Sequence, residues 1–156
     1  MKHFAILVLT FFFVSFTVPQ IDNRSYEDTV ELTKENLVKI MMDSGIQHVD
    51  VVLAQAILES GNFKSVIFRT KNNMFGMKMP GKRSTTATNE RGYKGYATYK
   101  NWVDCVRDYK LYQDYVTKNK NVSKSKYLSI IARSYSESEG YVEKLHKIMS
   151  QNKKYT

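Results

Sequence analysis

Glu59 is the residue whose type and position most clearly suggest chemistry, because it ends the mostly apolar segment 54–58 and is followed at once by Ser60-Gly61. Glycine commonly ends helices, so this glutamate is predicted to lie at a helix C-terminus. The helix end carries roughly half a negative charge, and that field, together with partial burial, disfavours the carboxylate. Such an acid keeps its proton to higher pH and can protonate the leaving oxygen of a sugar. Glu59 is our candidate general acid, although a surface glutamate at a frayed helix end explains this segment equally well.

The elements that would position Glu59 are predicted to be helices at both ends of the chain. Thr33 is the predicted N-cap of the first helix and Gly45 its end. The connector that holds Lys124 and Lys126 is predicted to be a solvated loop. Apolar residues recur with helical spacing in stretches that we place at residues 33–45, 50–61, 102–116, 127–131 and 141–149.

The middle of the chain has a different pattern. From Met79 to Thr98 the sequence is rich in Gly, Ser, Thr and Tyr, with turn signals at Pro80-Gly81 and Arg91-Gly92. This pattern predicts a small β-hairpin lobe beside the C-terminal end of the Glu59 helix, where it would form one wall of a groove. The expected fold class is therefore mainly α, with a small β component (α+β).

The length of 156 residues and the absence of repeats favour one domain after a leader segment. Lys2 and His3 precede an apolar run from Phe4 to Phe16, so residues 1–20 are predicted to be a signal peptide cleaved between positions 17 and 20. Residues 21–156 would then be a single catalytic domain, exported to the periplasm, the cell envelope or the medium. A retained membrane anchor is the alternative, but the run is shorter than the ~20 residues that span a bilayer.

Cysteine and histidine usage points away from disulfide and metal chemistry. Cys105 is the only cysteine, so no intramolecular disulfide can form, and its apolar neighbours suggest a small buried residue. His48 and His146 remain after leader removal, and neither has a neighbouring ligand at metal spacing. We expect no metal and no other cofactor.

Positive charge is concentrated in the predicted lobe. The chain has a net charge of +9, and residues 61–103 hold nine basic side chains and one acid, Glu90. Such a region attracts polyanions by long-range steering, and Lys82 and Arg83 are expected to be exposed members of it. In an exported protein, peptidoglycan with its peptide carboxylates is favoured over nucleic acid. A solvated basic surface without a ligand is the alternative.

Several segments together resemble glycoside hydrolase family 73, the flagellar and autolysin-type endo-β-N-acetylglucosaminidases. They are Ala54–Phe63, Asn72–Lys78, Gly95–Tyr99 and Tyr135–Leu145, and the resemblance extends over residues 33–150. Glu-Ser-Gly alone is a weak motif, because lysozyme-like and transglycosylase domains share it. Its combination with Asn-Asn-Met-Phe-Gly-Met-Lys some dozen residues later is specific.

The resemblance implies a lysozyme-like helical fold and cleavage of the β-1,4 bond on the reducing side of N-acetylglucosamine in peptidoglycan. We also expect a monomer. Glu59 matches the catalytic acid of the family. The residues that the resemblance places in the sugar groove are Phe63, Asn73, Phe75, Lys78 and Tyr99. Asn73 can hydrogen-bond sugar amides or hydroxyls and Phe75 can present a ring to a sugar face. The alternative is a structural turn in which Asn73 caps the backbone and Phe75 is core.

The partner of the acid has two candidates. Glu90 is the only acid between Glu59 and Asp104, and it falls in the predicted hairpin, where some family members carry their second carboxylate. The other mechanism uses the acetamido oxygen of the substrate as nucleophile, and Tyr135 matches the tyrosine that would hold it. Glu90 can instead pair with a neighbouring arginine, and Tyr135 can be a packing residue. The segment Ser136–Glu139 also departs from the family pattern.

Three other functions remain open at this point. A lytic transglycosylase or muramidase-type enzyme would also use Glu59, but its typical turn sequence is absent after that residue. A non-catalytic cell-wall-binding module would need only the basic lobe and its aromatic side chains. Binding of single-stranded nucleic acid through tyrosines and lysines of residues 93–100 has suitable ingredients, and the signal peptide argues against it.

Overall fold

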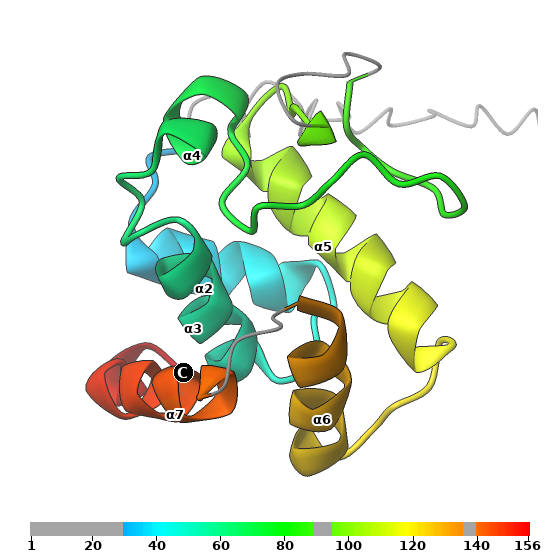
Figure 1. Cartoon of the computed structure of the whole chain (residues 1–156). Helices are drawn as coiled ribbons and strands as arrows, with labels where there is room; N and C mark the ends of the chain where they lie inside the picture. Colours follow the sequence, from blue (N-terminus) through cyan, green and yellow to red (C-terminus); the bar gives the residue numbers. More distant parts are fainter. Residues whose placement is uncertain (1–29, 89–94, 136–139) are drawn as a thin grey trace, which may run out of the picture.

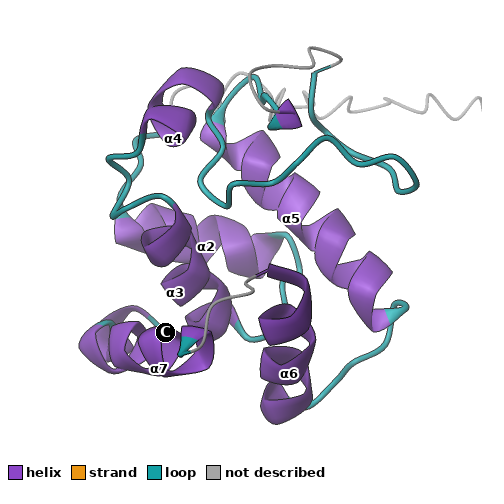
Figure 2. Cartoon of the chain, viewed as in Figure 1, coloured by secondary structure: helices purple, strands orange, loops and turns teal. Residues whose placement is uncertain are grey.

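A computed structural model of the chain describes residues 30–88, 95–135 and 140–156, so the predicted signal peptide (residues 1–20) lies outside the described residues. The described part is mainly helical, as predicted, with loops between the helices (Figures 1 and 2). The helices are α2 (Lys34–Asp43), α3 (Val49–Glu59), α4 (Val66–Lys71), α5 (Trp102–Thr117), α6 (Lys124–Tyr135) and α7 (Tyr141–Gln151), followed by the short 3₁₀ helix η2 (Lys153–Tyr155).

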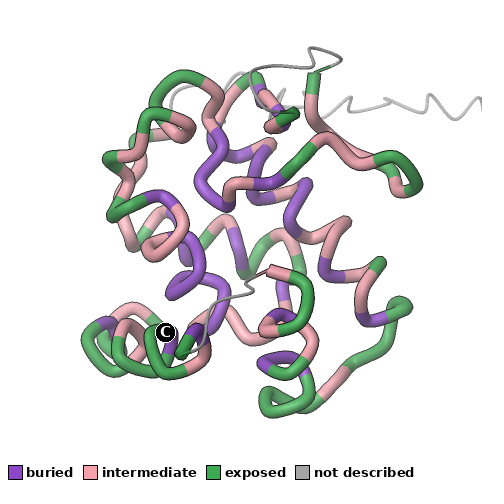
Figure 3. Tube along the Cα trace, viewed as in Figure 1, coloured by how far each residue is buried: buried purple, intermediate pink, exposed green. Residues whose placement is uncertain are grey.

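Helix α3 is the centre of the fold. Its residues 51–56 are all buried, and α7 packs along it while α2 lies behind it in the same view (Figures 1 and 3). A helix surrounded by other elements must be apolar on nearly every side, which explains the almost unbroken apolar sequence before Glu59. The C-terminal end of α3 is the part that reaches a cavity.

Helix α2 begins as predicted: Thr33 caps it, its hydroxyl oxygen accepting from the backbone N–H of Asn36 at 3.1 Å. Three other helices differ from the prediction. Helix α3 begins one residue before Asp50, because His48 turns into the left-handed region at φ 55°. Helix α6 begins at Lys124, so Lys124 and Lys126 belong to a helix and not to a loop. The sequence analysis missed α4 altogether, because its six residues show too short an apolar pattern.

The described residues contain no β-strand, so they do not form the predicted β-hairpin lobe. Two isolated antiparallel bridges, Lys78 with Tyr96 and Thr88 with Thr98, join the two arms of the segment. The side chain of Asn73 supplies bonds that a ladder would otherwise make, donating to the carbonyl oxygens of Met77 (2.8 Å) and Ala97 (2.9 Å). The segment therefore follows an irregular path whose geometry is set by side chains.

A buried ion pair anchors this segment to α5. The guanidinium of Arg83 donates to both carboxylate oxygens of Asp108, at 2.7 and 2.9 Å, and the Tyr99 hydroxyl donates to the same carboxylate at 2.7 Å. The Arg83 side chain is only 9% exposed and that of Asp108 is fully buried. The expectation that Arg83 is an exposed cation is therefore wrong. Burial by itself would raise the pKa of Asp108, but the hydrogen bonds from Arg83 and its neighbours outweigh burial and lower it.

We predict that Arg83→Gln destabilises the protein by about 3 kcal/mol, because it leaves the Asp108 carboxylate buried without its cation. The measurement is the free energy of unfolding in urea at pH 7. Lys82→Gln is the matched control, since the neighbouring Lys82 side chain is exposed, and it should change stability by less than about 0.5 kcal/mol. Equal effects for the two variants would contradict a structural role for the ion pair.

Candidate active site

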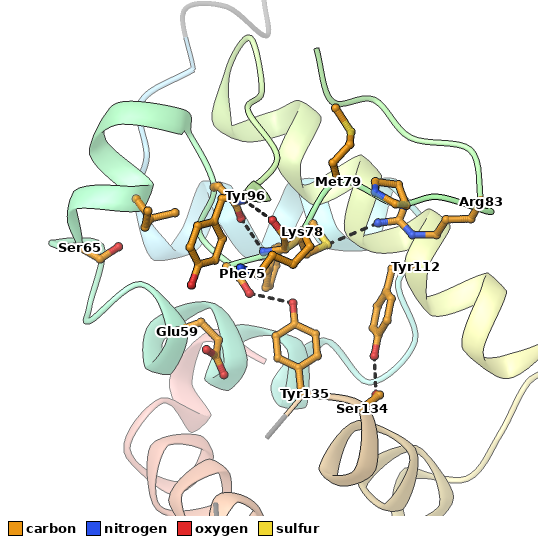
Figure 4. A pocket seen from close by; sticks show the side chains of 15 residues that line it. Glu59, Ser65, Phe75, Lys78, Met79, Arg83, Tyr96, Tyr112, Ser134 and Tyr135 are labelled. Carbon is orange, nitrogen blue, oxygen red and sulfur yellow. Dashed lines mark hydrogen bonds between the residues drawn. The ribbon is translucent and has the colours of Figure 1, made fainter. Parts of the chain in front are cut away.

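A cavity of about 560 Å³ lies at the C-terminal end of α3, between the irregular 72–83 segment and the last turn of α6. In Figure 4, Glu59 and Tyr135 lie on one side of this cavity and Tyr96 and Lys78 on the other. Its lining residues are Glu59, Ser65, Ile67, Asn73, Phe75, Gly76, Met77, Lys78, Met79, Pro80, Arg83, Tyr96, Tyr112, Ser134 and Tyr135. The cavity is therefore built by elements from both halves of the sequence.

Glu59 is the last residue of α3 and is half-buried in the wall of the cavity. The hydroxyl of Tyr141, the first residue of α7, donates to Glu59 Oε1 at 2.9 Å. Burial raises the pKa of Glu59, and the hydrogen bond from Tyr141 lowers it by a smaller amount, so the net pKa is above the usual value. A carboxylic acid that keeps its proton in an accessible cavity is suited to general acid chemistry.

Tyr135 lies next to Glu59 in the same wall. It is the last residue of α6, and its hydroxyl donates to the backbone carbonyl of Phe75 at 2.9 Å. Burial raises the pKa of Tyr135 well above its ordinary value, and the nearby Glu59 raises it further, so the phenol stays neutral. Because the Tyr135 hydroxyl donates its proton to the Phe75 carbonyl, its oxygen can act toward other groups only as a hydrogen-bond acceptor.

Asn73 and Phe75 touch the cavity but are occupied with the fold. The Asn73 side chain is buried, and besides its two donated bonds its carbonyl oxygen accepts from the backbone N–H of Met77 at 3.0 Å. Phe75 is completely buried, with its ring centroid 4.2 Å from that of Tyr109. The two side chains thus have the turn and core roles that the sequence left as their alternative, and the Phe75 carbonyl is bonded to Tyr135.

Lys78 and Tyr96 form the opposite wall. The Lys78 ammonium lies 3.9 Å from the centroid of the Tyr96 ring, within the range of a cation–π interaction. Lys78 is exposed and was predicted to line the groove; Tyr96 was not among the predicted groove residues. Their pairing presents an aromatic face and a positive charge to whatever enters the cavity.

Two further predicted site residues, Phe63 and Tyr99, do not line this cavity. Phe63 packs edge-on against Phe68, with 6.0 Å between ring centroids. Tyr99 is 2% exposed and its hydroxyl is bound to Asp108 in the interior. Glu90 lies outside the described residues. The sequence analysis did not identify Arg83, Tyr112, Ser134 or Tyr141 as site residues; of these, Tyr141 stands in a segment of the family resemblance, which is the signal that could have found it.

Within the described ranges, no three side chains of His, Cys, Asp or Glu gather where they could hold a metal ion. Nor does any helix of that part of the chain have the length and apolar character needed to cross a membrane.

Comparisons with known proteins agree with this geometry. A family model described as mannosyl-glycoprotein endo-beta-N-acetylglucosaminidase matches residues 34–154. The catalytic domain of the autolysin Auto from Listeria monocytogenes has a similar fold, with a TM-score of 0.56 and 19% identity over 89% of this chain and 98% of that one. A C-terminally truncated glycoside hydrolase domain of FlgJ from Salmonella typhimurium has a TM-score of 0.51 and 18% sequence identity, over 80% of this chain and 100% of that one. A comparison with curated protein sequences found no match.

We predict that the free energy of unfolding of Glu59→Gln, compared with that of wild type, is more favourable at pH 7 than at pH 3. The folded state raises the Glu59 pKa above its ordinary value of 4.5, so the contribution of Glu59 to stability is complete below pH 4.5 and is lost as the pH rises through the folded-state pKa. Glutamine has no such loss. Free energies of unfolding at both pH values test this, with the exposed Glu31→Gln as control. The prediction fails if the two variants show the same pH dependence.

Proposed function

This chain belongs to the mannosyl-glycoprotein endo-beta-N-acetylglucosaminidase family and is a glycosidase, and from this premise we propose that it is an exported peptidoglycan hydrolase. It would act as a monomer in the cell envelope or outside the cell and cleave the β-1,4 bond on the reducing side of N-acetylglucosamine. The observation that carries the proposal is the half-buried Glu59, whose pKa is raised by burial and which lines an accessible cavity.

In this proposal, Glu59 donates its proton to the glycosidic oxygen as the bond to the anomeric carbon breaks. The raised pKa keeps a larger fraction of Glu59 protonated at the pH of the cell surface than an exposed glutamate would have. No cation is paired with Glu59 among the ion pairs of the described residues, so its neutral form is not opposed by a fixed positive charge in contact.

The opposite wall suits an anionic glycan. Tyr96 offers a ring on which a sugar face can pack, and Lys78 adds a positive charge beside it. Peptidoglycan carries lactyl and peptide carboxylates, so charge attraction and sugar packing would act together at this wall. Arg83 contributes to the field of the cavity, but its guanidinium is already bound to Asp108 and is best regarded as structural.

The nucleophile in our proposal is the acetamido oxygen of the substrate. It attacks the anomeric carbon while the leaving oxygen takes the Glu59 proton; water then adds to that carbon, reopens the ring intermediate and returns a proton to Glu59. Tyr135 supports this route, because its proton is donated to the Phe75 carbonyl and its oxygen can accept from the acetamido N–H. That contact would orient the acetamido group for attack.

A carboxylate base is the second candidate for this step, and Glu90 would supply it. In the sequence, Glu90 falls between the two partners of each bridged pair, Lys78 with Tyr96 and Thr88 with Thr98. In this version Glu90 activates water directly, and the acetamido group only binds.

Two other functions would use the same cavity. A lytic transglycosylase or muramidase-type enzyme would produce anhydro sugars or new reducing ends on N-acetylmuramic acid, and a non-catalytic binding module would produce no fragments. Mass spectrometry of peptidoglycan digested by the protein separates these outcomes. Reducing-end N-acetylglucosamine supports our proposal, and any of the other results replaces it.

We predict that Glu59→Gln lowers turnover by about 10² to 10⁴, the usual contribution of a general acid, since glutamine has a similar size and no transferable proton. The rate of appearance of reducing ends from purified peptidoglycan measures this, and binding to insoluble wall material should be retained. A folded Glu59→Gln protein that keeps more than about a tenth of wild-type turnover would remove Glu59 from this role.

The two routes for the nucleophile rank two variants in opposite order. We expect Tyr135→Phe to lower turnover more than Glu90→Gln, because the acetamido group loses the hydrogen bond that orients it while Glu90 only assists water. Turnover of both folded variants on the same glycan is the measurement. A far larger loss for Glu90→Gln would favour the carboxylate base, and near-wild-type turnover for both would exclude both residues from catalysis.

A further inference from the structure

A continuous row of hydrogen-bonded side chains runs from the protein interior to the carboxyl group of Glu59. Its members, in order from the cavity inward, are Glu59, Tyr141, Gln55, Tyr109 and Tyr127. All except Glu59 are buried, the most exposed being Tyr141 at 5%. Glu59 and Gln55 lie four residues apart on α3, so they share one face of that helix. Inside a protein, a donor that faces another donor is costly, so the direction of every bond in this row matters.

The inner end of the row is the pair of Tyr127 and Tyr109, whose hydroxyl oxygens lie 2.6 Å apart. Tyr109 donates its proton to Gln55 Oε1, so the bond between the two phenols is donated by Tyr127. The other end of the same amide, Gln55 Nε2, donates to the Tyr141 oxygen at 3.1 Å. The Gln55 amide therefore accepts on its inner side and donates on the side that faces Tyr141.

The outer end of the row is Glu59. Because Gln55 Nε2 has no lone pair to accept with, the Tyr141 proton must point to Glu59 Oε1, 2.9 Å away. In a neutral carboxylic acid the carbonyl oxygen is a better acceptor than the hydroxyl oxygen. The Tyr141 bond therefore favours Oε1 as the carbonyl oxygen and Oε2 as the oxygen that carries the proton.

Building on the proposed function, we propose that Tyr141 and Gln55 are positioning residues that keep Glu59 Oε1 as a permanent acceptor and reserve Oε2 for the proton given to the substrate. A free carboxylic acid can carry its proton on either oxygen and rotate to present either one. The row removes that freedom before substrate arrives, which is the kind of preorganisation that raises turnover.

The groups that face Glu59 come from three parts of the fold. Tyr141 of α7 and Tyr135 of α6 both have pKa values raised by burial, so they remain neutral where Glu59 titrates. Lys78 and Arg83 of the 72–83 segment line the same cavity as cations. Glu59 is the group among these whose charge changes in the acid range, so the alkaline limb of the activity profile reports on it.

The test compares Tyr141→Phe with wild type on a soluble glycan fragment of peptidoglycan, over the full pH range of activity. We expect kcat on the acid plateau to fall about tenfold, because Glu59 then holds its proton on either oxygen. We also expect the alkaline limb of kcat/KM to move to higher pH, because the Tyr141 hydrogen bond lowers the Glu59 pKa. KM should change little, since the hydroxyl contacts Glu59 and not the substrate.

Gln55→Met is the second variant, chosen because methionine keeps the length and burial of the side chain while removing both amide bonds. Tyr141 remains but loses the donor that orients it, so the same two changes should appear in smaller size. Tyr115→Phe on the exposed face of α5 is the matched control for loss of a tyrosine hydroxyl and should behave as wild type. Thermal unfolding of every variant confirms that the measured protein is folded.

The outcomes separate the inference from the function on which it rests. A wild-type protein that does not cleave peptidoglycan overturns the proposed function, whatever the variants do. If wild type cleaves and folded Tyr141→Phe keeps both its acid plateau and its alkaline limb, the positioning role is wrong. A fall in turnover without any shift of the limb also overturns it, because simple loosening of the structure would give that result.

Discussion

The burial of α3 is the constraint on which the rest of the structure depends. A helix enclosed by α2, α7 and the aromatic residues of α5 must satisfy every polar group that it carries into the interior. Gln55 is such a group, and it is fully buried in an otherwise apolar run. Its hydrogen bonds to Tyr109 and Tyr141 tie α3 to α5 and to α7 at once. No buried side-chain nitrogen or oxygen among the described residues lacks a hydrogen-bond partner, so this demand is met.

The same constraint accounts for the electrostatics of the cavity. Glu59 stands where α3 leaves the core, partly desolvated and held by one phenol donor, and desolvation wins over that single hydrogen bond. Asp108 shows the opposite balance, because a bidentate arginine and a tyrosine hold its buried carboxylate in the charged form. The half-buried Glu59 and the fully buried Asp108 thus have opposite preferences for the protonated and the charged form, and the difference lies in whether a cation reaches them. One is suited to give up a proton and the other to hold a loop in place.

The irregular 72–88 segment illustrates how side chains can replace a regular sheet. Asn73 bonds to the backbone of Met77 and Ala97, and Arg83 fastens the far part of the segment to α5. The result is a cavity wall whose shape follows from a few specific polar contacts. Such a wall can place Lys78 and Tyr96 opposite Glu59 without the spacing that a β-ladder would impose.

Local sequence information determined several features of this protein. Apolar periodicity, the Thr33 cap and the glycine after Glu59 act within one helix, so they predicted most helices and the position of Glu59 at a helix end. The resemblance to a hydrolase family rests on short motifs and was confirmed by the family match over residues 34–154. A six-residue helix and an irregular segment gave too little pattern to be predicted.

Only the tertiary structure decided which side chains meet. Tyr141 lies 82 positions from Glu59 in the sequence, and Tyr99 and Arg83 both reach Asp108. Residue type suggested that Arg83 is solvated, and the family resemblance placed Tyr99 and Asn73 in the groove, with a structural turn as the alternative for Asn73. The fold placed all three in internal hydrogen bonds. The physical reason is that charge, burial and hydrogen-bond partners depend on contacts between distant segments, whereas periodicity and capping depend on neighbours along the chain.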